Sequence, residues 1–138
     1  MGFFVAPEPG DIVYCRFPEK GLPGPAPKPR PALVLAAGEI GGNPHVAVAY
    51  GTSQNMDRLY PGEFLIRPAD AEAYTLCGLS VPTKFDLRGV KELPYNEQWF
   101  RVPPGAPHGQ TPRLGVLHPS LVRRGKAAFA AASRTGRR

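Results

Sequence analysis

The sequence predicts a mainly β fold, a small and strongly bent sheet or barrel completed by a C-terminal α-helix and one further short helix. Three observations support this class. The chain has 138 residues, 42% of them hydrophobic, which suits one domain with a modest core. Its apolar runs are short and are separated by prolines and glycines, a pattern typical of strands. A single long segment, after Pro119, repeats its apolar residues at helical spacing.

The first strand is predicted over residues 12–17, where Val13, Cys15 and Phe17 share one face and Arg16 points to the other. Residues 18–31 then hold six prolines and two glycines, which exclude both a helix and an interior strand. A loop of this length without secondary structure is uncommon in a compact domain unless it binds something. It is therefore the first functional candidate.

Two further strands are predicted in the first half of the chain. Residues 31–37 form a continuous apolar run, as expected of a strand buried on both sides, and residues 38–44 read as a turn. Residues 45–50 resume as a strand that ends at Gly51, so that Thr52 and Ser53 lie at the edge of a sheet.

The second half of the chain alternates short strands and helices. A strand is predicted at residues 63–66 and a short helix at 68–74. The clearest alternation places Leu79, Val81, Thr83, Phe85 and Leu87 on one strand face, and Ser80, Pro82, Lys84, Asp86 and Arg88 on the other.

Residues 95–102 and 114–117 are the last predicted strands, with a proline- and glycine-containing loop at 102–112 between them. The C-terminal helix begins near Pro119, and its predicted apolar positions are Leu121, Val122, Ala128, Phe129 and Ala132. Five to seven short strands and one long helix fit a small bent sheet or barrel of the SH3-like kind.

The net charge of +6 is concentrated at one end of the chain. All eleven acids lie at or before Glu97, and seven basic residues lie at Arg113 or later. The first 112 residues carry ten basic and eleven acidic groups, so the excess charge belongs to the last 26 residues. A basic C-terminal helix of this kind is more often a solvated surface than a nucleic-acid site.

Cysteines, histidines and known motifs exclude several classes of function. The two cysteines, Cys15 and Cys77, stand alone, and His45, His108 and His118 lie at separate element edges, so no metal site is expected. There is no GxxxxGK[ST], GxSxG, HExxH or GxGxxG motif, and no cofactor is expected. Without a signal peptide or an apolar run of about 20 residues, we expect a soluble cytoplasmic protein that does not use the membrane.

Polar residues gather at the ends of the predicted strands. Arg30 precedes the buried strand, Thr52 and Ser53 follow the next one, and Lys84, Asp86 and Arg88 share one strand face. A guanidinium fork with neighbouring hydroxyl groups suits an oxyanion or a phosphate. The alternative is that each is a solvated charge, a turn residue or a surface ion pair worth under about 1 kcal/mol.

Four segments resemble the MazF/PemK-like toxin family of type II toxin–antitoxin systems. They are GDIVY at 10–14, KPRPALVL at 28–35, VAVAYGTS at 46–53 and GLSVPTKFDL at 78–87. The resemblance implies an SH3-like barrel of the MazF, PemK and CcdB type over residues 1–138, with 113–138 as a basic extension. It also implies a homodimer, a cognate antitoxin, and a metal-independent endoribonuclease that cleaves single-stranded RNA to a 2′,3′-cyclic phosphate and a 5′-hydroxyl.

The resemblance also assigns roles to residues. Arg30 matches the family arginine that acts in acid/base catalysis and stabilises the transition-state charge. Thr52 matches the threonine that hydrogen-bonds the phosphorane, and Ser53 would assist it. Lys84, Asp86 and Arg88 match more loosely, as catalytic or RNA-binding residues. The substrate loop would include Arg16, Glu19, Lys20 and Lys28. The chain departs from the family pattern in its longer proline-rich loop, in Gly51 and in its C-terminal basic helix.

Two other functions stay open at this point. A non-catalytic SH3-like module would use the proline-rich loop and the aromatic residues between Tyr95 and Phe100 to hold a protein or a nucleic acid. A toxin that acts on a protein target such as a topoisomerase would not need Arg30 or Thr52 and would depend on the C-terminal residues instead.

Overall fold

The computed structural model describes residues 2–19 and 21–135 and is built around one antiparallel sheet. Its strands are β1 (Asp11–Cys15), β2 (Arg30–Ile40), β3 (Asn43–Thr52), β4 (Glu63–Ile66), β5 (Thr83–Pro94) and β6 (Arg113–Val116). The helical elements are the 3₁₀ turn η1 (Pro68–Asp70), the short helix α1 (Glu72–Cys77) and the C-terminal helix α2 (Pro119–Thr135). This confirms the mainly β class with one long and one short helix.

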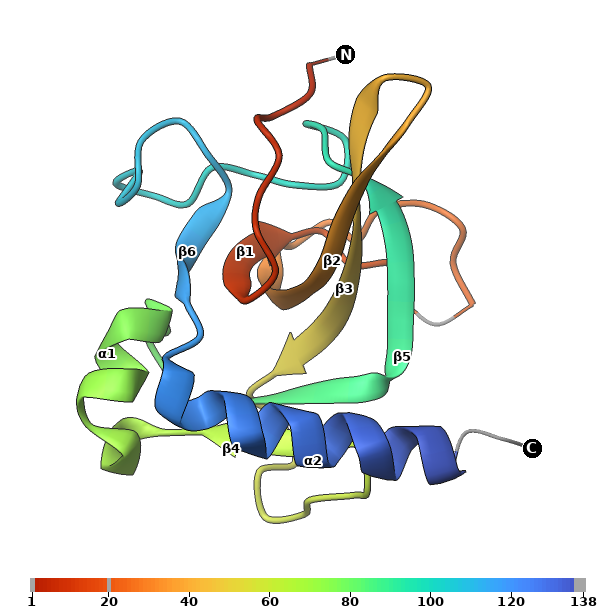
Figure 1. The fold of residues 1–138 in the computed structure, drawn as a ribbon. Helices are drawn as coiled ribbons and strands as arrows, with labels where there is room; N and C mark the ends of the chain where they lie inside the picture. The colour runs from red at the N-terminus through yellow and green to blue at the C-terminus, as the bar shows by residue number, and fades with distance from the viewer. Residues whose placement is uncertain (1, 20, 136–138) are drawn as a thin grey trace.

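The six strands pair in the order β4-β5-β3-β2-β1-β6, and the sheet is bent but not closed. The register of the β3–β5 ladder shifts between Val48 and Tyr50, and Figure 1 shows β5 turning sharply along its length. The first part of β5 therefore pairs with β4 and the end of β3, and its last part pairs with the start of β3. This bend brings the ends of β2, β3 and β5 together with β4.

Each face of the sheet carries its own core. One core joins Ile12, Leu33, Phe64 and Phe85 to the inward residues of α1 and α2, and α2 runs across β4 and β5 (Figure 1). The other is made by Val13, Cys15, Val34, Val48, Leu93, Tyr95 and Phe100. Val13 and Cys15 thus share a face, and Phe17 packs against it, as the alternation predicts.

The β2–β3 hairpin is longer and more exposed than the sequence predicts. The turn is only Gly41 and Gly42, whose φ angles of 61° and 82° favour glycine, and both strands run up to it. β2 is buried from Ala32 to Val34, but residues 36–40 are exposed. The expectation of burial on both sides is therefore wrong for the end of this strand, because that end projects beyond the rest of the sheet.

The remaining boundaries differ at three places. The helix predicted at 68–74 is divided at Ala71, whose φ of 56° ends η1 before α1 begins. β5 begins only at Thr83, so Val81 lies outside the strand and is exposed, contrary to the alternation. In α2, Leu121, Ala128 and Ala132 face the core, whereas Val122 and Phe129, one residue further round the helix, are exposed.

The strand predicted at 95–102 does not form. Tyr95 and Phe100 are buried there, but the backbone turns between them because the Asn96 side chain accepts hydrogen bonds from the backbone N–H groups of Gln98 and Trp99. Only single bridges join this segment to others, from Asn96 to Phe3 and from Phe100 to Cys15. Aromatic residues alone gave a false strand signal.

Candidate functional site

Residues at one end of four strands share a single face of the sheet. Tyr50 pairs with Ala32 on β2 and with Asp86 on β5, and Asp86 pairs in turn with Glu63 on β4. Thr52 pairs with Lys84. Because residues two apart along a strand point the same way, Arg30 falls on this same face, next to Thr52 when the β2–β3 register is continued. The structure thus brings together Arg30, Thr52, Lys84 and Asp86, which the sequence predicts from separate segments.

Gly51 is required by this arrangement. A Cβ at this position would lie 2.6 Å from the carbonyl oxygen of Pro31 and 2.8 Å from the ring of Phe85. Only glycine therefore allows β3 to pack this closely against β2 and β5. The residue that departs from the family pattern is thus the one that keeps Thr52 close to the Arg30 end of β2.

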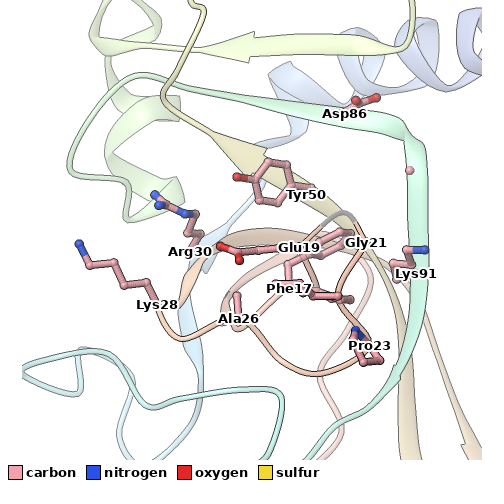
Figure 2. A pocket seen from close by; sticks show the side chains of 13 residues that line it. Phe17, Glu19, Gly21, Pro23, Ala26, Lys28, Arg30, Tyr50, Asp86 and Lys91 are labelled. Carbon is pink, nitrogen blue, oxygen red and sulfur yellow. The ribbon is translucent and has the colours of Figure 1, made fainter.

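Two adjoining pockets open on this face and share Tyr50 and Asp86. The first, of about 790 Å³, lies between the proline-rich loop (residues 18–29) and β5, and Arg30 lines it. Figure 2 shows Arg30, Glu19 and Tyr50 gathered on one side of this pocket, with Lys91 on the β5 wall. The second pocket, of about 550 Å³, is lined by Thr52 and by the 53–62 loop that joins β3 to β4. Together they form an open groove, in which Arg30 lines the first pocket, Thr52 lines the second, and Tyr50 lines both.

Arg30 and Thr52 are both available to a ligand. The half-buried Arg30 lines the first pocket, and its guanidinium has no hydrogen-bond or ion-pair partner among residues 2–19 and 21–135. The Thr52 hydroxyl oxygen accepts a hydrogen bond from the backbone N–H of Gln54 at 3.1 Å, which leaves its O–H free to donate outward. Ser53 is exposed and lines neither pocket, so the structure does not bring it to the groove.

Lys84 is buried, although the alternation places it on the polar face. Its ammonium group donates to the carbonyl oxygens of Asn55 at 3.0 Å and Arg58 at 2.9 Å, and to Glu63 Oε1 at 3.1 Å. These bonds use all three of its donors. The side chains of Lys84 and Glu63 are only 4% and 7% exposed. Lys84 therefore holds the 53–62 loop in place and has no donor left for a ligand.

Asp86 is held as a carboxylate by Arg88. Arg88 donates to both carboxylate oxygens, from Nε at 2.9 Å and from Nη2 at 3.0 Å, and its backbone N–H adds a third bond. Burial raises the pKa of Asp86, but the side-chain and backbone hydrogen bonds of Arg88 outweigh it and leave the pKa below its usual value. The same contact raises the pKa of Arg88. Asp86 stays charged while lining both pockets.

Of the four residues predicted for the substrate loop, two face the groove, one does not, and one is not described. Glu19 and Lys28 line the first pocket. Arg16 instead fastens the loop, because its guanidinium donates to the carbonyl oxygens of Ala26 at 2.7 Å and Gln98 at 3.2 Å. Lys20 lies outside the described residues.

Sequence reasoning missed the aromatic part of the groove. The rings of Tyr50 and Phe17 lie 5.2 Å apart at the first pocket, and Tyr60 lies under Arg88 and Lys84 at the second. Tyr50 could have been found from its spacing, because it stands two residues before Thr52 on the same strand face. Glu63, the partner of Lys84, carried no such signal.

Other features of the chain do not form a site. Cys15 and Cys77 are free, buried and in different cores. Within the described ranges, no three His, Cys, Asp or Glu side chains cluster in a way that could hold a metal ion. No helix in those ranges is long and apolar enough to span a membrane. At the basic C-terminal end, Arg113 and Arg124 form ion pairs with Asp11 and Asp70, and Arg137 and Arg138 lie outside the described residues.

Comparisons with known proteins give the family and the fold of the chain. Residues 8–94 match the family model described as "PemK-like, MazF-like toxin of type II toxin-antitoxin system". No curated protein matches the chain. A solved structure entitled "Endoribonuclease in complex with its cognate antitoxin from Mycobacterial species" is similar in fold, with a TM-score of 0.58 and 16% sequence identity. The likeness covers 94% of this chain and 96% of that one.

Proposed function

The chain belongs to the family of PemK-like, MazF-like toxins of type II toxin–antitoxin systems, and on that premise we propose that it is an endoribonuclease that cleaves single-stranded RNA. The observation that carries the proposal is the Arg30 guanidinium, which has no partner among the described residues and lies in an open groove on the same sheet face as Thr52. Three cations line the second pocket. The Lys84 ammonium uses all its donors, Arg88 is bound to the Asp86 carboxylate, and the Arg58 guanidinium donates to the Tyr60 hydroxyl at 2.9 Å.

The proposed reaction is an internal transfer within the RNA. The 2′-hydroxyl attacks the adjacent phosphorus, a new P–O bond forms, and the P–O5′ bond breaks. The products are a 2′,3′-cyclic phosphate and a 5′-hydroxyl, and the proton of the 2′-hydroxyl is balanced by protonation of the leaving oxygen. Negative charge grows on the non-bridging phosphate oxygens in the transition state. Fixed donors placed at that charge accelerate such a step by about 10²- to 10³-fold each.

Each groove residue has a role that fits its surroundings. Arg30 binds the non-bridging oxygens through its planar fork of donors and acts through its charge, because an arginine pKa above about 12 makes it a poor proton donor. Thr52 donates a further hydrogen bond to the phosphorane. Asp86, held ionised by Arg88, accepts a hydrogen bond from the attacking 2′-hydroxyl. Its lowered pKa makes it a weak base, so its main contribution is orientation.

Lys84 has a different role in this proposal from the one that the resemblance implies. Its ammonium is enclosed by Asn55, Arg58 and Glu63 and therefore acts as a positioning residue through the 53–62 loop. That loop carries Asn55 and Arg58 to the wall of the second pocket. RNA contact by Lys84 itself is not part of the proposal.

We also propose that a cognate antitoxin restrains the enzyme and that the active form is a cytoplasmic homodimer. An antitoxin with an acidic segment would compete with RNA phosphates for Arg30 and Lys28, since both are unpaired in the described part of the chain. Sedimentation of the purified protein tests the dimer. A small acidic reading frame beside the gene would supply the antitoxin.

The direct test incubates purified protein with single-stranded RNA in EDTA. We expect cleavage by the wild type and at least a 100-fold slower rate for Arg30→Ala. Arg123→Ala is the matched control, because Arg123 is an exposed arginine on α2 with no assigned role, and it should cleave at the wild-type rate. EDTA-resistant cleavage by Arg30→Ala at a rate close to that of the wild type would refute the site. RNA 5′ ends mapped after induced expression test the same point in cells, and growth arrest without new ends would indicate a protein target.

A further inference from the structure

We propose that the first pocket is a nucleobase site, in which the unpaired base beside the cleaved phosphate stacks on Tyr50. This inference rests on the proposed function and names the part of the RNA that the groove reads. It makes Tyr50 a residue that determines sequence preference, distinct from Arg30 and Thr52, which act on the phosphate.

The pocket has the aromatic surface that such a site needs. The half-buried ring of Tyr50 lies against Phe17, with 5.2 Å between ring centroids and 46° between their planes. Phe17 packs on the core and holds the Tyr50 ring from one side. The Tyr50 hydroxyl has no hydrogen-bond partner among the described residues, and the residue lines the open first pocket. A base can therefore stack on it.

The charges around the pocket suit a nucleotide chain. Lys28, Arg30 and Lys91 line it, and none of their side chains has a partner in the described ranges. Two acidic residues, Glu19 and Asp86, line the same pocket, and the charge of Asp86 is already neutralised by Arg88. The pocket thus combines a stacking surface with unpaired cations, which is how proteins hold single-stranded nucleic acids. In a duplex the bases are stacked inside the helix and could not enter, so the pocket selects single strands.

The position of Tyr50 connects the base to the reacting phosphate. Tyr50 stands two residues before Thr52 on one strand face, a separation of about 6.6 Å along β3. Arg30 lines the same pocket as Tyr50. A phosphate held between Arg30 and Thr52 therefore has an adjacent base within reach of the Tyr50 ring. The proline-rich loop, with Leu22 and Pro23 on its pocket side, closes the far wall.

Binding without cleavage tests this proposal. The probes are single-stranded RNA oligonucleotides with 2′-O-methyl groups throughout, which cannot be cleaved by the proposed reaction, carrying 2-aminopurine at one position at a time. Stacking quenches 2-aminopurine fluorescence. We expect strong quenching at one position, lost in Tyr50→Ala with a five- to 150-fold weaker affinity. Tyr50→Phe should bind within about twofold of the wild type, and so should the distant control Arg123→Ala.

A second measurement leaves the protein unchanged. An abasic residue at the quenched position of the probe should weaken binding to the wild type by the same factor as Tyr50→Ala does. The same abasic residue should not weaken binding to the Tyr50→Ala variant any further. Unchanged affinity for both the abasic probe and Tyr50→Ala would overturn the proposal. Failure of the proposed function can be told apart from failure of the base site. Tyr50-dependent quenching by a protein that never cleaves RNA would support the base site and refute the nuclease activity. Cleavage at wild-type sites by a Tyr50→Ala variant that binds normally overturns the pocket alone.

Discussion

Replacement of Lys84 by methionine should destabilise the protein by about 3 kcal/mol. The change keeps the length of the side chain but removes an ammonium with three hydrogen bonds, and it leaves the Glu63 carboxylate buried at 7% exposure. Removal of one partner of a buried ion pair costs about 3–5 kcal/mol. The low end applies here, because Glu63 keeps the Tyr60 backbone N–H at 2.8 Å and Arg88 at 3.5 Å.

The assay is urea unfolding at pH 7, followed by the fluorescence of Trp99, the one tryptophan of the chain. Lys126→Met is the matched control, because Lys126 is an exposed helical lysine, and it should cost under about 0.5 kcal/mol. Adding Glu63→Gln to Lys84→Met should recover about 1 kcal/mol or more, since a neutral amide no longer needs a buried cation. A loss for Lys84→Met as small as that for Lys126→Met would refute the role of Lys84 as an anchor of the 53–62 loop.

Three further predictions concern other parts of the chain. Thr52→Ala should slow RNA cleavage about 100-fold, whereas Ser53→Ala, outside both pockets, should change the rate less than threefold in the same assay. Burial raises the pKa of Cys77 to about 11, so a thiol reagent at pH 8 should label neither cysteine until urea unfolds the protein; rapid labelling would contradict the packing. The Arg124 hydrogen bonds lower the pKa of Asp70, so this partly exposed pair stabilises the fold by under about 1 kcal/mol above about pH 4, and the contribution is lost as the pH falls through the lowered pKa. Arg124→Ala should therefore lose more stability at pH 7 than at pH 2, where the Asp70 interaction is weakened and the hydrogen bond to the Leu65 carbonyl oxygen stays.

Much of the site could be predicted from the sequence because its residues stand at strand ends. Arg30 precedes an apolar run and Thr52 follows another, and antiparallel pairing of neighbouring strands brings such ends together. The strand alternation also placed Asp86 correctly on the polar side. The chemical roles of these residues follow from the family resemblance rather than from strand patterning, and they remain proposals.

The sequence could not predict what depends on distant partners. Lys84 follows the polar positions of its strand, yet it is buried because Glu63 and two loop carbonyls meet it there. Residues 95–102 contain strand-favouring aromatics, but a side-chain hydrogen bond from the backbone to Asn96 turns the chain. Tyr50 lines the first pocket because the proline-rich loop, distant in the sequence, forms the opposite wall. Each of these outcomes depends on tertiary contacts that no local pattern contains.

The central claim is that the groove between Arg30 and Thr52 cleaves RNA by using the RNA's own 2′-hydroxyl as the nucleophile. The most direct measurement compares two oligonucleotides in EDTA that differ by one atom, one all-ribose and one with a single 2′-deoxy residue at the mapped cleavage site. We predict that the wild-type protein cuts the first, leaves a 2′,3′-cyclic phosphate, and does not cut the second at that bond. Cleavage of the 2′-deoxy bond at a comparable rate would show that another nucleophile attacks and would contradict the account.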